Sequence, residues 1–320
     1  MKIAGIGAAF PAQCIANAEI ERRLGLEQGW AMRRTGVRVR PHAAPHEATS
    51  DLAVRAGQAA LTDAGIDPRD VALLLLATST PDYPLPPTAP QVAHRLGLVR
   101  AGAVDLAAAC AGFVYALALG EAYGRTVCGC VLVIGANVLS RRVDPDDPAM
   151  ATLFADGAGA AVLVPGEAVL GVYLGAHGEH WDEIFIAAGG SREPITAEAI
   201  AAGRHVMRMN NGPELFRRAV QMMAQAGVRA LEAARLSASH VDLWVPHQAN
   251  RRIISQAGRL LGIPAERTVD IVECYGNSSA ATIPIALCVA RERGLLQRGH
   301  NVLLTAVGAG LVTAGLVLRW

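Results

Sequence analysis

The chain has 320 residues, which is enough to bury a large core as one large domain or as two of moderate size. It carries 29 Lys and Arg residues against 28 Asp and Glu residues, a formal net charge of +1. This balance gives no electrostatic reason to expect nucleic acid or a membrane surface as a partner.

Localisation and metal binding are predicted from three short segments. The opening residues 1–3 lack the basic and apolar regions of a signal peptide, and the apolar stretch 107–120 is too short to span a bilayer. Of the six cysteines, Cys128 and Cys130 are close in sequence, but Cys-x-Cys without a second ligand pair is poor spacing for zinc. We therefore expect a cytoplasmic protein with reduced thiols and no metal.

In chain order, the first half alternates apolar helical and strand-like segments. A helix over residues 51–64 leads to a strand over 71–77, and a helix over 113–123, ending near Gly124, leads to a strand over 131–134 and a hairpin-like segment over 158–164. The second half repeats this order, with helices over 213–234 and 283–289 and strands over 241–245, 302–306 and 311–318.

This repetition predicts an internally duplicated α/β protein with mostly parallel sheets. The boundary is expected near residues 165–169, giving an N-terminal half over 1–167 and a C-terminal half over 168–320. Functional residues from both halves are expected to meet at the seam between them.

The segment DLAAACAGF places Cys110 where a strand-like run becomes helical. A thiol at a helix N-terminus faces unpaired N–H groups and the positive end of the helix dipole, which both favour the nucleophilic thiolate. The alternative is a buried core cysteine, the more common role of an isolated Cys in an Ala-rich segment.

Two later motifs favour the nucleophile. His247 lies in VPHQAN, directly after a predicted buried strand, and Asn277 lies in YGNSSAA, a turn of small residues before an apolar helix. A lone His or Asn would more often be a structural residue or a helix cap, but here each lies in a motif, in the order Cys, His, Asn.

With these motifs, the chain resembles the β-ketoacyl-acyl-carrier-protein synthase III family of thiolase-like condensing enzymes over nearly its whole length. The resemblance also includes the opening MKIAGIGAAFP, WAMRRTG, FADGAG and the Gly308–Ala309–Gly310 loop. It implies a layered α/β/α/β/α fold, a homodimer, and catalytic roles for Cys110, His247 and Asn277. The implied reaction passes an acyl group to Cys110 and joins it to the enolate left when malonyl-acyl carrier protein loses CO₂.

The resemblance also assigns groups around this centre. His247 and Asn277 would stabilise the enolate, and the backbone N–H groups of Cys110 and Ala309 would form an oxyanion hole. For Gly308–Gly310 alone, an ordinary tight bend is the other interpretation. No cofactor is implied; coenzyme A and phosphopantetheine thioesters are substrates.

Residues for carrier binding are predicted at the mouth of the site. Trp30 and Arg34 resemble residues that line the coenzyme A site, although an arginine that clamps adenine in the family is replaced by Pro148. Trp30 and Arg34 could also be ordinary surface residues. Three arginines are expected to meet acidic acyl carrier protein, unless they form only a solvated face: Arg217, Arg251 and Arg252.

The primer is predicted from departures from the acetyl-primed enzyme. Leu85, in place of an aromatic that closes the partner's acyl pocket, would leave a longer pocket. Arg142, with Arg141 as its competitor, would bind a terminal carboxylate, assisted by Ser79 and Thr282. Both arginines could instead be surface residues paired with Asp144 or Asp146.

This combination resembles the branch that makes 3-oxopimeloyl-acyl carrier protein for biotin from a glutaryl thioester. The alternatives are initiation of fatty acid synthesis with acetyl or another short primer, acyl transfer without decarboxylation, a hydrolase, and a non-catalytic scaffold. Asn277 argues against simple acyl transfer, and the chain lacks the G-x-S-x-G motif of many hydrolases.

Overall fold

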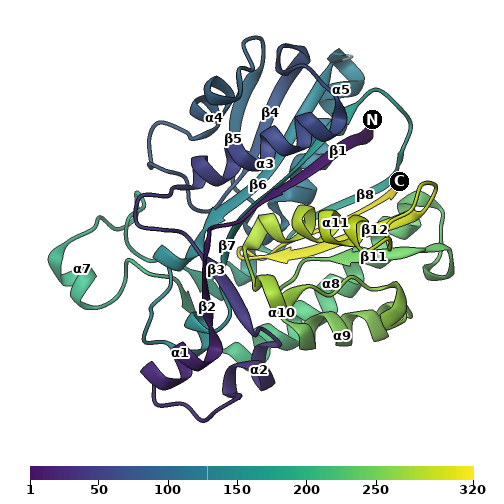
Figure 1. Ribbon diagram of the computed structural model, residues 1–320. Coiled ribbons are helices and arrows are strands. Elements are labelled where there is room, and N and C mark those ends of the chain that lie inside the picture. The colour runs from purple at the N-terminus through teal and green to yellow at the C-terminus, as the bar shows by residue number, and fades with distance from the viewer. Residues whose placement is uncertain (128) are drawn as a thin grey trace.

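The computed structural model describes residues 1–127 and 129–320 and contains two central β-sheets (Figure 1). Cys128, one of the two closely spaced cysteines, lies outside the described residues. The first sheet has five strands in the order β1-β7-β6-β4-β5. Their bounds are β1 Lys2–Ala9, β4 Val71–Ala77, β5 Gly102–Leu106, β6 Cys130–Val138 and β7 Asp156–Val164.

The second sheet repeats this arrangement with four strands in the order β11-β12-β13-β8. Its strands are β8 Val169–Ala176, β11 Leu243–Pro246, β12 Asn301–Gly308 and β13 Val312–Arg319. Strands β8, β13, β12 and β11 thus follow the same order as β1, β7, β6 and β4. The predicted division between residues 167 and 168 falls in the connection between β7 and β8 and stays a prediction.

The prediction of mostly parallel sheets is wrong. The pairs β4–β5, β4–β6 and β11–β12 are parallel, but β1–β7, β6–β7, β12–β13 and β8–β13 are antiparallel. In each half a hairpin-like return follows the βαβ unit, and such a return reverses the strand direction. The apolar runs predict that these strands exist but not which way they lie in the sheet.

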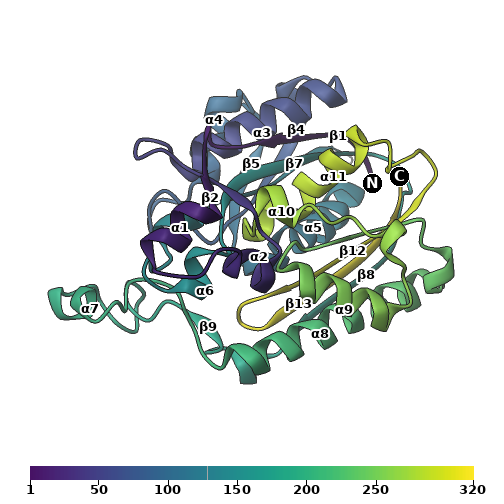
Figure 2. The same ribbon diagram turned by 60° about the horizontal axis from the view of Figure 1, so that its bottom comes forward.

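Helices form three layers around the two sheets (Figures 1 and 2). The first helix of the middle layer, α5 (Gly112–Val127), packs on β4 and β6 of the first sheet and on β12 and β13 of the second. The other, α11 (Thr282–Glu292), packs on β1 and β7 and on β11, and it is buried along most of its length for this reason. The outer layers are α3 (Thr49–Ala64) with α4 (Ala89–Leu96), and α8 (Gly212–Ala234) with α9 (Arg251–Leu261).

The remaining short elements surround one end of the two sheets. They are β2 Gln13–Ala16, α1 Asn17–Arg23, α2 Trp30–Thr35, β3 Val39–His42, α6 Pro148–Ala151, β9 Ile184–Phe185, α7 Ala197–Ala201, β10 Arg208–Met209 and α10 Val272–Tyr275. Helix α7 lies on an arm that projects from the body (Figure 1). Among the described residues, no helix has the length and apolar character needed to cross a membrane.

Candidate active site

A cavity of about 760 Å³ lies where the two halves meet, and Cys110, His247 and Asn277 all line it. Cys110 comes from the first half, just before α5. His247 follows β11, and Asn277 precedes α11. The structure therefore brings the three predicted catalytic residues to one place, although they are far apart in the sequence.

Cys110 lies in a 3₁₀ turn, Ala109–Ala111, that runs directly into α5. Its Sγ accepts a hydrogen bond from Ser279 Oγ at 3.4 Å. Ala109 and Ser279 have φ angles of 44° and 55°, in the left-handed region that residues other than glycine rarely adopt. Two strained turns thus meet at the sulfur, a feature that often accompanies functional sites.

The expectation that the helix N-terminus makes the thiolate the favoured form is not met, because burial of the sulfur outweighs the local donors. Burial raises the pKa of the Cys110 thiol to about 11, and the hydrogen bond from Ser279 opposes this only in part. Loss of hydration disfavours the charged sulfur more than the local donors favour it. The resting residue at neutral pH is therefore a thiol.

The loop predicted to form the oxyanion hole lies against this turn. Ala309 lies in the loop between β12 and β13 and lines the cavity. A Cβ atom on the adjacent Gly308 would lie only 2.8 Å from the backbone nitrogen of Cys110. Any side chain at position 308 would therefore push the two segments apart. The role of the Cys110 and Ala309 N–H groups stays a prediction, which this close approach supports.

His247 is 1% exposed, and its backbone N–H donates to the Thr305 carbonyl at 2.7 Å. Burial lowers the pKa of the imidazole to about 3, so the ring is neutral at physiological pH. Its Nδ1 lies 2.7 Å from Thr282 Oγ1. The only ring nitrogen left to meet a substrate is therefore Nε2.

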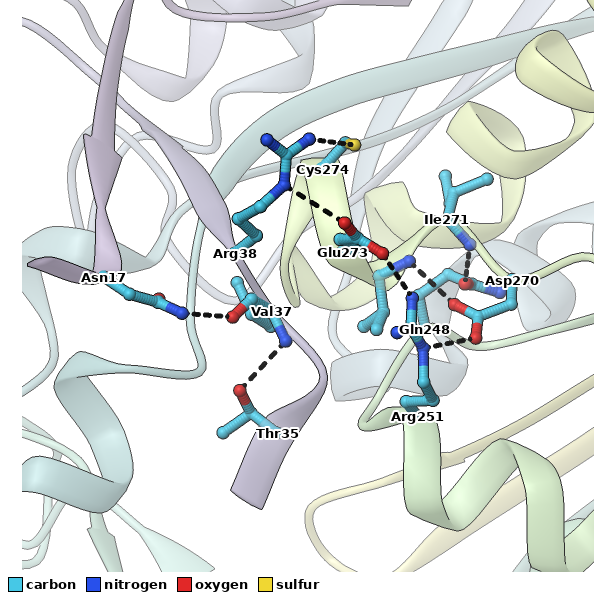
Figure 3. A network of polar contacts seen from close by, with 11 residues as sticks. Asn17, Thr35, Val37, Arg38, Gln248, Arg251, Asp270, Ile271, Glu273 and Cys274 are labelled. Carbon is cyan, nitrogen blue, oxygen red and sulfur yellow. Dashed lines mark hydrogen bonds and ion pairs between the residues drawn. The ribbon is translucent and has the colours of Figure 1, made fainter. Parts of the chain in front are cut away.

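The loop that follows His247 is held by a polar network (Figure 3). The Gln248 side chain accepts from the Ile271 N–H and donates to the carbonyls of Pro246 and Val269. Beside it, Arg251 pairs with Asp270 and Glu273, and Glu273 also pairs with Arg38 of the first half. The network ties the histidine loop to both halves.

Asn277 is 4% exposed, and its Oδ1 accepts the Ser279 N–H at 2.9 Å. This contact fixes which end of the amide is oxygen, so the donating end is Nδ2. The described partner of Nδ2 is the Ala249 carbonyl at 3.5 Å, a long contact. Asn277 therefore offers a pre-oriented N–H donor.

Of the residues predicted to bind substrate, Trp30, Arg34 and Ser79 line the cavity. The Arg34 guanidinium stacks over the Trp30 ring at 4.9 Å. Thr282 does not line the cavity, and its hydroxyl is buried against His247; its contact with the primer stays a prediction. Leu85 does not line it either and is 83% exposed.

The two adjacent arginines are distinguished by their contacts. Arg141 donates to the carbonyls of Ala44, Pro45 and Glu47, so it is not available to a substrate. The Arg142 guanidinium makes no hydrogen bond or ion pair to the described residues, which excludes pairing with Asp144 or Asp146 here. Arg142 itself does not line the cavity. Its backbone carbonyl accepts a hydrogen bond from the N–H of Met207, and Met207 does line the cavity.

The three arginines predicted to bind a carrier protein differ in whether they already have an acidic partner within the chain. Arg217 pairs with Glu214, and Arg251 with Asp270 and Glu273, so both are already neutralised within the chain. Arg252 lies at the cavity, stacked over the Phe216 ring at 5.0 Å. Of the three, Arg252 is the one whose charge faces the mouth without an acidic partner among the described residues.

Sequence reasoning missed two features of the site. Ser279 lies in the recognised YGNSSAA motif, but its contact with Cys110 depends on the packing of the turn Ser279–Ala281 against the turn Ala109–Ala111. The wall formed by Ile184–Ile186, Met207 and Met209 comes from short strands without a periodic pattern. Nothing in these segments indicates a pocket before the chain is folded.

The comparisons with known proteins all indicate the same family, and the similar proteins match nearly the whole chain. The sequence matches the family 3-oxoacyl-[acyl-carrier-protein] synthase III over residues 104–178 and its C-terminal part over residues 231–320. It is 58% identical to a 3-oxopimeloyl-[acyl-carrier-protein] synthase of Rhodothermus marinus, over 99% of this chain and 93% of that protein. It is 45% identical to a protein of the same name from Brucella abortus, over 99% and 97% of the two chains.

A solved structure of a β-ketoacyl-[acyl carrier protein] synthase III from Thermus thermophilus superposes with a TM-score of 0.92 at 38% identity, covering 100% of this chain and 99% of the other. The layered fold and the shared cavity define an acyl-transferring condensing enzyme with a thiolase-like fold. The chain belongs to the 3-oxoacyl-[acyl-carrier-protein] synthase III family.

We expect Ser279→Ala to slow alkylation of Cys110 about three- to tenfold at pH 8, because it removes a hydrogen bond that lowers the pKa of the thiol. In the wild type the rate should rise about tenfold per pH unit from pH 7 to 10, below a pKa of about 11. Peptide mapping after iodoacetamide treatment measures this rate, with exposed Cys14 as the internal control. Equal rates at Cys110 in the two proteins would assign Ser279 no effect on the sulfur.

Proposed function

We propose that this enzyme makes 3-oxopimeloyl-acyl carrier protein from a glutaryl thioester and malonyl-acyl carrier protein, in support of biotin synthesis. The Cys110 sulfur attacks the glutaryl carbonyl and releases the carrier thiol. Malonyl-acyl carrier protein then loses CO₂, and the resulting enolate carbon attacks the acyl-enzyme carbonyl. The new carbon–carbon bond forms as the C–S bond to Cys110 breaks, and the thiolate that leaves takes up one proton from solvent, which restores the thiol.

One observation carries the condensation: Cys110, His247 and Asn277 share one cavity, with the His and Asn donors pre-oriented and the histidine neutral. A neutral imidazole and an amide stabilise a developing enolate oxygen by hydrogen bonding. The primer is supported by the two relatives named 3-oxopimeloyl synthases, at 58% and 45% identity.

The primer carboxylate is assigned to Arg142. Its backbone lies directly behind the cavity wall, joined to Met207 by a hydrogen bond of 2.6 Å, and its side chain has no described partner. A guanidinium makes two parallel hydrogen bonds to a carboxylate, which an acetyl or butyryl group cannot return. The alternative function remains initiation of fatty acid synthesis with an acetyl or other short primer.

The proposal includes the partners. Malonyl-acyl carrier protein would dock near Arg252, and the primer would arrive as a coenzyme A or carrier protein thioester past Trp30 and Arg34. A homodimer is proposed because the loop with Tyr83 (58% exposed) and Leu85 is apolar and exposed and does not line its own cavity, so that it would be free to close a partner's. A cytoplasmic location is part of the same proposal.

We expect the wild type to prefer glutaryl over butyryl thioester in kcat/KM. The preference should be about 5- to 150-fold, from the roughly 1–3 kcal/mol that hydrogen bonds between the half-buried Arg142 and a carboxylate contribute and that a methyl end cannot provide. Arg142→Ala should lose most of this preference and keep activity on butyryl thioester. Arg142→Lys, which keeps the charge but not the paired hydrogen bonds, should fall between them. A wild type that prefers acetyl or butyryl thioester would replace the proposed primer with the short-chain alternative.

A further inference from the structure

The Thr282 hydroxyl is enclosed by three polar groups beside His247. Thr282 is 2% exposed and begins α11, away from the cavity wall. Its Oγ1 lies 2.7 Å from His247 Nδ1, 3.3 Å from the Gln248 backbone nitrogen and 3.0 Å from the Ser279 carbonyl oxygen. No water or substrate is needed to satisfy it.

Counting protons limits how these contacts are made. A hydroxyl has one hydrogen, and the Gln248 N–H is a donor, so it occupies a lone pair of Oγ1. The neutral imidazole carries one hydrogen in total, on Nδ1 or on Nε2. The hydroxyl hydrogen therefore has only two possible acceptors, His247 Nδ1 and the Ser279 carbonyl oxygen.

Two observations favour Nδ1 as the acceptor. The Ser279 carbonyl already accepts the backbone N–H of Thr282, whereas Nδ1 has no other partner in the described part of the chain. The distance of 2.7 Å to Nδ1 is typical of a hydroxyl donor and short for an N–H donor. The Gln248 N–H thus donates to Thr282 Oγ1, and the Oγ1–H donates to Nδ1.

We propose that Thr282 is a positioning residue that holds His247 in the tautomer with its hydrogen on Nε2. This tautomer presents an N–H group to the cavity, which is what stabilisation of an enolate oxygen requires. The opposite tautomer would present a lone pair to that oxygen and repel it. The inference rests on the proposed condensation, and it assigns Thr282 to the decarboxylation step rather than to recognition of the primer.

The test compares Thr282→Val, which keeps the side-chain shape without the hydroxyl, with Thr282→Ser, which keeps the hydroxyl. We expect Thr282→Val to lower CO₂ release from malonyl-acyl carrier protein on the order of 10–100-fold, since a wrong tautomer removes the donor. Acylation of Cys110 should change less than about threefold, and the glutaryl-to-butyryl ratio should not change. Thr282→Ser should restore most of the CO₂ release.

Nitrogen NMR of histidine-labelled enzyme gives a readout that a merely structural role would not move. The wild type and Thr282→Ser should show His247 protonated at Nε2, and Thr282→Val should show loss of this preference. A wild type protonated at Nδ1 overturns the proposal, whether or not the valine variant folds.

Two kinetic results would also overturn it. One is a Thr282→Val enzyme with normal CO₂ release and an altered primer ratio, which would return Thr282 to the primer site. The other is an equal loss of acylation and CO₂ release that Thr282→Ser does not restore. Failure of the proposed condensation is distinct from both, because the wild type itself would then release no CO₂ from malonyl-acyl carrier protein; failure of the proposed primer alone would change the glutaryl-to-butyryl ratio of the wild type and leave its CO₂ release intact.

Discussion

Replacing Cys110 by alanine should abolish condensation, with a loss in kcat/KM on the order of 10³-fold or more. The variant cannot form the acyl-enzyme, so the reaction loses the intermediate that divides it into two easier steps. Incubation of the wild type with glutaryl thioester should add one acyl group, and peptide mapping should place it on Cys110.

Cys274→Ala is the matched control for this substitution. Cys274 is also partly buried, and its Sγ lies 3.7 Å from an Arg38 nitrogen, which gives it a cationic neighbour that Cys110 lacks. We expect this variant to keep wild-type condensation and acylation. An acyl group found on Cys274, with Cys110 unmodified, would contradict the assignment of the nucleophile.

His247→Ala and Asn277→Ala should each slow CO₂ release from malonyl-acyl carrier protein about 10²- to 10³-fold, the usual effect of removing one oxyanion donor. Acylation of Cys110 should be spared by comparison, because the described contacts of the sulfur are with Ser279 and its own turn. Single-turnover acylation and CO₂ release measured separately provide this comparison.

The same experiment tests the protonation state of His247. Because the pKa of this imidazole is lowered to about 3, the ring stays neutral from pH 8 down to about pH 4. CO₂ release by the wild type should therefore not fall as the pH drops through 6.5, the usual pKa of a histidine. A fall there that is absent from His247→Ala would show that His247 titrates in this range.

Equal losses of acylation and CO₂ release in both variants would contradict the division of roles between Cys110 and the two donors.

The sequence alone predicted the repeated elements well where apolar periodicity is strong. The predicted strand over 71–77 coincides with β4, and the predicted helix over 213–234 differs from α8 by one residue. Strand direction was not predictable, since an apolar run looks the same whether its neighbour lies parallel or antiparallel.

The site shows a similar division between local and non-local information. Cys110, His247 and Asn277 were predicted because each lies in a motif. The contact of Thr282 with His247 was not predictable, because it depends on how α11 packs against the loop after β11. The acidity of Cys110 was misjudged because desolvation depends on the whole cavity rather than on the adjacent helix.

The position of Asn277 couples assembly to activity. Its backbone N–H donates to the Leu153 carbonyl, and its own carbonyl accepts the Ala155 N–H, so a residue of the C-terminal half is held by the N-terminal half. These contacts join residues more than 120 positions apart, so they exist only while the two halves are packed together. Turnover therefore reports that the two halves have docked.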